Sequence, residues 1–349
     1  MAVDLEKLSG VGLGQGLQDD AIDKLAKAWI SHQLRAGEVL WKQGEPSSSI
    51  GLLYRGELQV FVDGQDIGTV RPGQIFGEAS VYNPTAKRSA TLRAVFPTEV
   101  LLLDRSDLDW LERDVPIFFD RLITMSLEAM AKRIRTTDKV IANLSPGRSQ
   151  LPSHGIGAAR TVWRSVRKTF GLQRPDLESL LSQLPHMQQA TQAQLAVLAS
   201  SFTADPFERG EIIIREGSQG NSLFLVGSGT VKATKNIHGH GAEDLVQFDA
   251  GDMFGLIALV KPGERTASCI GRAPGWVFTM DHRTYRSMEL RSRITWKSCL
   301  ASVLAVQLRI ANGLVARSLV GEHGGPITGA DLSRIIASAG VVANEVVDD

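Results

Sequence analysis

The sequence repeats itself, because a pattern of glycines in its first half returns in its second half. Three glycines recur with unchanged spacing, namely Gly37, Gly44 and Gly56 in the first copy and Gly210, Gly217 and Gly229 in the second. Two more follow slightly later in the second copy, as Gly73 and Gly77 against Gly251 and Gly255. The five extra residues fall in the segment NIHGHGAED, which we expect to be a loop because loops tolerate insertions. A chain of 349 residues with such a period is predicted to fold as two copies of one domain.

Each copy is built from short apolar or β-branched runs that Gly and Pro interrupt. The clearest runs are Val39, Ile50–Tyr54, Leu58–Val62 and Val100–Leu103 in the first copy, and Ile212–Ile214, Leu223–Val226, Leu245–Phe248 and Trp276–Met280 in the second. Short strands separated by tight turns are typical of a barrel or a sandwich. Glycine is expected at such turns because it alone adopts positive φ without strain.

Helical periodicity flanks both copies. We predict helices over Gln18–Ser31, Ser106–Glu112 and Phe118–Ile141 around the first copy, and over Thr191–Ser200, His282–Glu289 and Ser292–Leu319 around the second. The resulting division is a domain A over residues 17–141, a linker over 142–183, a domain B over 184–319 and a tail over 320–349.

Composition excludes several classes of protein. The 38 basic and 38 acidic residues cancel, so a chain-wide basic field is absent and no nucleic-acid partner is expected. Two cysteines cannot form a disulfide framework, which favours a reducing, cytoplasmic location. No signal peptide is evident at the N-terminus. The most apolar stretch, residues 300–320, is interrupted by polar side chains and predicts an amphipathic helix rather than a membrane span.

The linker is basic, with six Arg or Lys residues and no acid between residues 140 and 175. Its segment ARTVWRSVRKTF places cations beside an aromatic face, with Arg160, Trp163, Arg164, Arg167 and Lys168 among its members. Three interpretations stay open: a solvated linker helix, a segment that contacts a membrane surface or an acidic partner, and a helix that docks onto one of the domains.

The chemistry-bearing segment of the first copy begins where a strand is expected to end, at Phe76. Gly77 allows a close approach of the backbone to an anion, and Arg88 can make charge-assisted contacts with phosphate oxygens. Glu78 repels a phosphate but can accept a hydrogen bond from a sugar hydroxyl. An acid and an arginine in one cradle therefore suggest a ligand that carries both a phosphate and a free hydroxyl.

The segment FGEASVYNPTAKRSAT resembles the phosphate-binding cassette of cyclic-nucleotide-binding domains, found in regulatory subunits of cAMP-dependent kinases and in bacterial cAMP receptors. The resemblance implies a mainly β fold with flanking α-helices, as two jelly-roll β-barrels with helical lids. It also implies that Glu78 holds the ribose 2′-hydroxyl, that Arg88 binds the cyclic phosphate with backbone N–H groups of Ser80 and Ser89, and that a long helix closes over the base. The implied ligand-binding residues are Phe76, Gly77, Glu78, Ala79, Ser80, Arg88, Ser89 and Ala90.

The second copy departs from this pattern. Its implied, weaker ligand-binding residues are Gly255, Leu256, Ile257, Ala258, Arg265, Thr266 and Ala267. The arginine is kept, but Leu256 stands where the ribose acid is expected. A buried hydroxyl without a partner costs about 1–3 kcal/mol. Domain B is therefore expected to be a weak site, a site without ligand, or a site for a different ligand.

The identity of the base is open. A hydroxyl follows the arginine in both copies, as Ser89 and as Thr266, and relatives of the family use a hydroxyl there for either nucleotide. We expect cAMP first in domain A, with cGMP as the alternative.

These features predict a non-enzymatic receptor that binds a cyclic nucleotide and signals to a separate, unidentified effector protein through a lid helix. No nucleophile motif, HExxH pattern or P-loop is present, and no cofactor or metal is expected, since His238 and His240 lack a third ligand. The alternatives are a transcription regulator, for which the roughly 30 residues after Leu319 are too few, and a scaffold with vestigial sites. The long helices leave room for a homo-oligomer.

Overall fold

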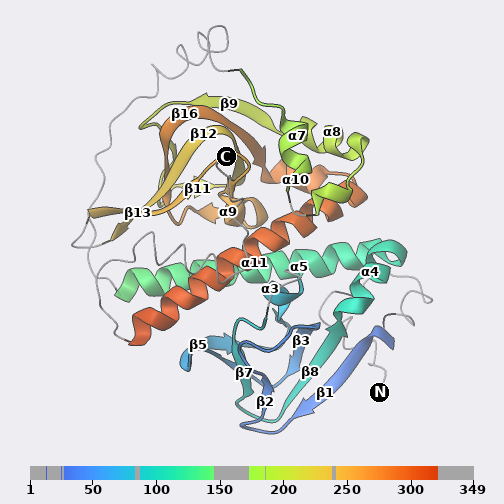
Figure 1. Cartoon of the computed structure of the whole chain (residues 1–349). Coiled ribbons are helices and arrows are strands. Elements are labelled where there is room, and N and C mark those ends of the chain that lie inside the picture. The colour runs from blue at the N-terminus through green and yellow to red at the C-terminus, as the bar shows by residue number, and fades with distance from the viewer. Residues whose placement is uncertain are drawn as a thin grey trace, which may run out of the picture. The chain divides into compact units, whose positions relative to one another are not determined.

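The computed structural model describes Leu13, Leu25 and residues 27–82, 87–144, 173–184, 186–237 and 241–320 (Figure 1). The chain divides into two compact units, Met1–Ile141 with Leu300–Asp349, and Ala142–Cys299. Several predicted features lie outside the described residues, namely the linker helix with Arg160, Trp163, Arg164, Arg167 and Lys168, the histidines His238 and His240, and the tail after Val320. The linker's role and the domain boundaries therefore stay predictions.

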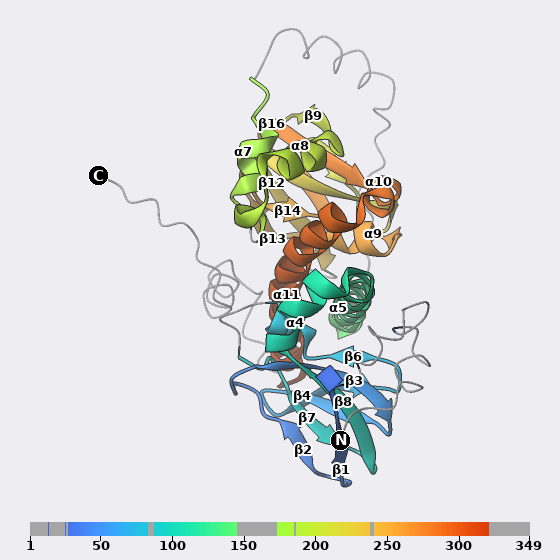
Figure 2. The same ribbon diagram turned by 90° about the vertical axis from the view of Figure 1, so that its right-hand side faces the viewer.

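The first unit holds two antiparallel sheets of four strands each. The strands are β1 (Trp29–Leu34), β2 (Val39–Trp41), β3 (Ser49–Arg55), β4 (Leu58–Val62), β5 (Gln65–Val70), β6 (Ile75–Phe76), β7 (Thr91–Ala94) and β8 (Thr98–Asp104). Their orders are β1-β8-β3-β6 and β2-β7-β4-β5. The sheets lie face to face (Figure 2) and share one apolar core, to which Leu53 of the first and Leu58 of the second contribute.

The second unit repeats this plan with longer strands. They are β9 (Thr203–Phe207), β10 (Ile212–Ile214), β11 (Gln219–Gly220), β12 (Ser222–Ile237), β13 (Gly241–Phe248), β14 (Met253–Phe254), β15 (Gly263–Glu264) and β16 (Ser268–Asp281). A six-stranded sheet contains the path β10-β16-β12-β13, with β14 on β12 and β9 on β16, and β11 pairs with β15. The mainly β, jelly-roll fold with flanking helices is confirmed, although the strands form open sheets and not closed barrels.

Helices flank the sheets much as the periodicity predicts. They are α3 (Glu78–Val81), α4 (Arg105–Asp114), α5 (Pro116–Leu144), α7 (Leu177–Ser182), the 3₁₀ helix η1 (Met187–Gln189), α8 (Gln192–Ser200), α9 (Leu256–Val260), α10 (His282–Ser287) and α11 (Leu290–Val320). Local chemistry sets their starts. The Asp104 carboxylate accepts a hydrogen bond from Ser106 N at 3.1 Å, and Thr191 with Gln194 forms a capping box.

The predicted helix over Gln18–Ser31 is wrong at its C-terminal end. Residues 29–31 belong to β1, which pairs with β8 from Trp29↔Leu103 to Leu34↔Thr98. Both Trp29 and Leu34 are buried, so packing against the sheet outweighs the short helical pattern in this segment.

The five-residue insertion of the second copy was predicted to be a loop, and this prediction is wrong. In the first copy, the hairpin β4–β5 ends at the pair Val62↔Gln65. The equivalent pair in the second copy, Lys235↔Glu243, is followed by Asn236↔Ala242 and Ile237↔Gly241. The insertion therefore adds two residue pairs to the hairpin, which a ladder accepts because both strands lengthen together.

Helix α11 is long and apolar enough, by length and composition alone, to cross a membrane over Leu290–Gly313. However, 65% of the most apolar stretch is buried inside the protein, as in the core helix of a folded domain.

Candidate functional site

The candidate site of domain A begins where β6 ends. Gly77 has φ +80° and leads into α3, so the chain turns sharply at this point. A Cβ atom at Gly77 would lie 2.7 Å from the Trp41 ring and 2.8 Å from Arg88 Nη1. Only glycine meets both conditions, the positive φ and the close approach of Trp41 and Arg88.

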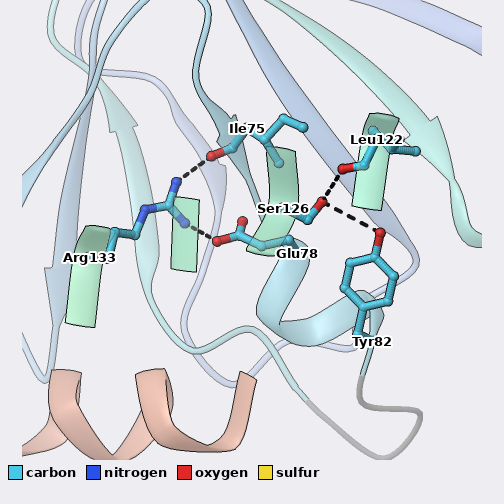
Figure 3. A network of polar contacts seen from close by, with 6 residues as sticks. All are labelled: Ile75, Glu78, Tyr82, Leu122, Ser126 and Arg133. Atoms are coloured by element: carbon cyan, nitrogen blue, oxygen red, sulfur yellow. Dashed lines mark hydrogen bonds and ion pairs between the residues drawn. The ribbon is translucent and has the colours of Figure 1, made fainter. Parts of the chain in front are cut away.

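Glu78 is the first residue of α3, and its side chain is fully buried. Arg133 of α5 donates one hydrogen bond to Glu78 Oε1 and another to the carbonyl oxygen of Ile75 (Figure 3). The other carboxylate oxygen, Oε2, has no hydrogen-bond partner in the part of the chain that the structure describes. Among the described residues, the protein thus satisfies one oxygen of this acid and leaves the other as a buried acceptor without a donor.

Burial raises the pKa of Glu78 above its usual value of 4.5, even though the charges of Arg133 and Arg88 lower it. The native protein therefore binds the proton of the Glu78 carboxyl more tightly than the unfolded chain does. Protonation of Glu78 stabilises the native state, and this stabilisation is fully present below pH 4.5. That stabilisation is lost as the pH rises through the native pKa.

The variant Glu78→Gln should therefore become more stable relative to the wild type as the pH rises from about 4.5 to 8. Urea unfolding of both proteins at several pH values measures the difference. A constant difference across that range would show that the Glu78 proton is held no more tightly in the native state than in the unfolded chain.

Backbone hydrogen bonds fix the position of Arg88. Its N–H donates to Glu45 O at 2.8 Å, and its carbonyl accepts from Gly44 N at 2.9 Å. The side chain is only 4% exposed. Its Nη1 donates to Ser49 O at 2.8 Å and its Nη2 to Ser49 Oγ at 3.1 Å, whereas Nε has no partner among the described residues.

The charge of Arg88 is not neutralised by direct contact with an acid. Within the described ranges, the guanidinium forms hydrogen bonds to Ser49 but no ion pair. Burial lowers its pKa to about 10, while Glu45 and Glu78 act in the opposite direction through their charges. A buried cation without an ion-pair partner is costly, and an anionic ligand would remove that cost.

Two further contacts of the cradle are one aromatic contact and one hydrogen bond. The guanidinium carbon of Arg88 lies 3.3 Å from the centroid of the Trp41 ring. Ser80, buried in α3, donates from Oγ to Lys87 O at 3.4 Å, so α3 is tied to the segment that carries Arg88. Phe76 and Ala79 are buried, and Ser89 and Ala90 are half-buried beside Arg88 in the chain.

Helix α11 also contacts the cassette, through the part that belongs to the first unit. Ser302 Oγ donates to Tyr82 O at 2.9 Å, and Arg309 Nη2 donates to Lys87 O at 2.6 Å. The hydroxyl of Tyr82 points to Ser126 Oγ of α5, which in turn donates to Leu122 O (Figure 3). Two long helices therefore contact the cassette, α11 at Tyr82 and Lys87 and α5 at Tyr82.

Domain B repeats the arginine geometry without the acid. Gly255 has φ +77° before α9, and Arg265 donates to Ser222 O at 2.7 Å and to Ser222 Oγ at 3.0 Å. Arg265 Nη1 also donates to Gly255 O at 3.2 Å. Leu256, in the place of Glu78, is buried and apolar. Of the other predicted residues of this site, Ala258 is buried, and Ile257, Thr266 and Ala267 are half-buried.

The structure brings Gly77, Glu78 and Arg88 together in one cradle, as the sequence interpretation requires. That interpretation missed Trp41, Ser49 and Arg133. The sequence does contain a sign of Ser49, because the alignment of the two copies that matches Gly44 with Gly217 also matches Ser49 with Ser222. For Arg133 there was none, since it lies 55 residues beyond Glu78 on a helix with several other cations.

Comparison with known proteins finds a family and several relatives to which the chain is similar. The sequence profile of the family described as the cyclic nucleotide-binding domain matches residues 31–114 and again residues 205–291. A solved structure that the chain resembles is the regulatory domain of Toxoplasma gondii PKA with cAMP, at 19% identity and a TM-score of 0.29, covering 81% of this chain and 90% of that one.

Curated relatives are similar over most of this chain. The cGMP-dependent protein kinase egl-4 of Caenorhabditis elegans is 25% identical over 273 residues, which cover 77% of this chain and 28% of the kinase. The cGMP-dependent protein kinase 2 of Homo sapiens is 24% identical over 256 residues, 73% of this chain and 26% of the kinase. The chain thus matches little more than a quarter of the length of these relatives. With a match in each half, the chain belongs to the cyclic nucleotide-binding domain family and carries two such domains in tandem.

Proposed function

We propose that this chain is a non-enzymatic receptor that binds a cyclic nucleotide in domain A and passes the signal to a separate effector protein. One observation carries the proposal. Arg88 is a buried cation that forms no ion pair within the described residues, at the position where the family cassette meets the cyclic phosphate. An anionic phosphodiester supplies the missing negative charge in a water-excluded site.

The neighbouring acid explains why the ligand is a nucleotide and not a simple phosphate. Glu78 Oε2 is buried without a hydrogen-bond partner among the described residues, and it is suited to accept a hydrogen bond from a ribose 2′-hydroxyl. A buried acceptor gains a partner when the ligand binds, and this gain selects for ligands that carry the hydroxyl.

The signal would leave the site through Arg133. This residue joins the ribose acid to α5, so a change at Glu78 changes the contact that holds the lid helix. Only a ligand that binds the open and closed helix positions with different affinities can shift their populations. The proposal also includes that the effector protein acts in the cytoplasm and that the receptor needs no cofactor or metal.

The sequence interpretation and the curated relatives favour different bases in the nucleotide. The sequence interpretation puts cAMP first, whereas the curated relatives are kinases named for cGMP. Both nucleotides must therefore be tested side by side.

Calorimetric titration of the Arg265→Met protein isolates domain A, because this change removes the arginine of domain B. We expect saturable heat from cAMP or cGMP and about ten- to hundredfold weaker binding of the 2′-deoxy analogue, which lacks the hydroxyl for Glu78. In Glu78→Ala on the same background, the parent nucleotide and its 2′-deoxy analogue should bind with similar affinity. Absence of heat from both nucleotides would remove the proposed function. Discrimination that survives the loss of Glu78 would leave binding in place but remove the role of this acid.

A further inference from the structure

The guanidinium of Arg88 rests on an aromatic face. Its central carbon lies 3.3 Å from the Trp41 ring centroid, the distance of a direct stack. The six-membered part of the same indole lies against Gly77, where a Cβ atom would be only 2.7 Å from it. Trp41 therefore contacts both the cation of the cradle and the glycine that opens it.

Trp41 also borders the apolar core. Trp41 packs against the core cluster of the two sheets, and its ring centroid lies 5.2 Å from that of Phe76. An arginine directly above aliphatic side chains would lose hydration and gain nothing in return. A π face gives the cation a favourable surface at the boundary of the core.

The two copies supply an aromatic ring from different strands. The residue equivalent to Trp41 in domain B is Ile214, whereas the residue equivalent to Gly51 is Phe224. The Arg265 guanidinium carbon lies 5.6 Å from the Phe224 ring centroid. In domain A, a side chain at position 51 would overlap the ring of Phe76. Among the described residues, a ring thus lies near the arginine in each copy, and the contact is closer in domain A, at 3.3 Å, than in domain B, at 5.6 Å.

We propose that Trp41 is a positioning residue of domain A, which holds the plane of the Arg88 guanidinium so that it meets the ligand phosphate without rearrangement. Ser49 accepts hydrogen bonds from Nη1 and Nη2 of the Arg88 guanidinium, and the Trp41 indole contacts the face of the same group. A group that is held in place before binding loses little entropy on binding. The effect on affinity rests on the proposed function, whereas the effect on Arg88 itself does not.

The first experiment compares nucleotide affinity in the Arg265→Met background. Trp41→Ile, which introduces the residue of domain B, should bind cyclic nucleotide about ten- to thirtyfold more weakly. Trp41→Phe keeps a ring face and should stay within about threefold of its parent. Trp110→Phe is the matched control, because Trp110 lies on α4 and bonds to Asp107, and it should leave the affinity unchanged. Equal affinity of Trp41→Ile and its parent would overturn the proposal.

The second experiment needs no ligand. Thermal unfolding of Trp41→Ile, Arg88→Met and the double variant forms a cycle that measures the coupling of the two side chains. The double variant should lose less stability than the sum of the single changes, since the contact is already absent in each. Additive changes would overturn the proposal. If the parent protein binds neither nucleotide, the proposed function fails, and the cycle alone decides whether Trp41 positions Arg88.

Discussion

Replacing Arg88 with methionine should reduce cyclic nucleotide affinity of domain A at least a hundredfold while changing the melting temperature of the ligand-free protein by less than about 5 °C. The loss follows because charge-assisted hydrogen bonds to phosphate contribute about 1.5–3 kcal/mol each. The change in stability is small because the lost contacts with Ser49 and Trp41 are offset by the removal of a cation that is buried without an ion pair in the described part of the chain. Methionine retains most of the volume above Trp41.

Calorimetry and thermal unfolding of the same samples measure both effects. Arg71→Met is the matched control, because the Arg71 side chain is 72% exposed and lies 3.9 Å from Glu57, and it should change neither quantity. A drop in melting temperature of Arg88→Met beyond about 5 °C would mean that the arginine is structural. Retained affinity would mean that the phosphate is bound elsewhere.

Replacing Arg133 with methionine should destabilise the first unit by about 3 kcal/mol at neutral pH. Glu78 is fully buried, and Arg133 is its hydrogen-bonded cation, so the change leaves a buried carboxyl without its partner. Adding Glu78→Gln to this variant should restore most of the loss, because an amide carries no charge. The deficit should also be smaller at pH 4.5, because the pKa of Glu78 is raised above that value and the acid is then protonated.

Urea unfolding of the single and double variants at two pH values tests this prediction. Lys132→Met, a change at the exposed neighbouring position of α5, serves as the control and should have little effect. A loss of stability in Arg133→Met that Glu78→Gln does not restore would show that the arginine acts through Ile75 O or through packing, and not through the acid.

The repeat and the cassette were accessible from sequence because both depend on local conformation. The predicted turn glycines do adopt positive φ, with Gly37 at +82° and its equivalent Gly210 at +81°. The cradle around Gly77 likewise follows from residues close together in the chain. The start of β1 was missed because its pairing partner, β8, is the last strand of the same unit, and no local signal reports pairing between segments so distant in sequence.

The remaining site residues depend on tertiary contacts. Arg133 reaches Glu78 from a helix on which the pattern marks several equally suitable cations. Trp41 is an apolar residue in a strand, a position at which the sequence indicates only core packing. Its contact with Arg88 depends on the pairing of β2 with β7, which follows Arg88 in the chain, and the pattern of either segment alone does not indicate it.

The hydrogen bonds from α11 to Tyr82 and Lys87 limit how the protein can be dissected. The donors, Ser302 and Arg309, come from the far end of the chain, although they serve a cassette near its beginning. A fragment that ends after α5 would lack both of these hydrogen bonds. The nucleotide affinity of such a fragment would therefore differ from that of domain A in the full chain, and titrations should use the intact polypeptide.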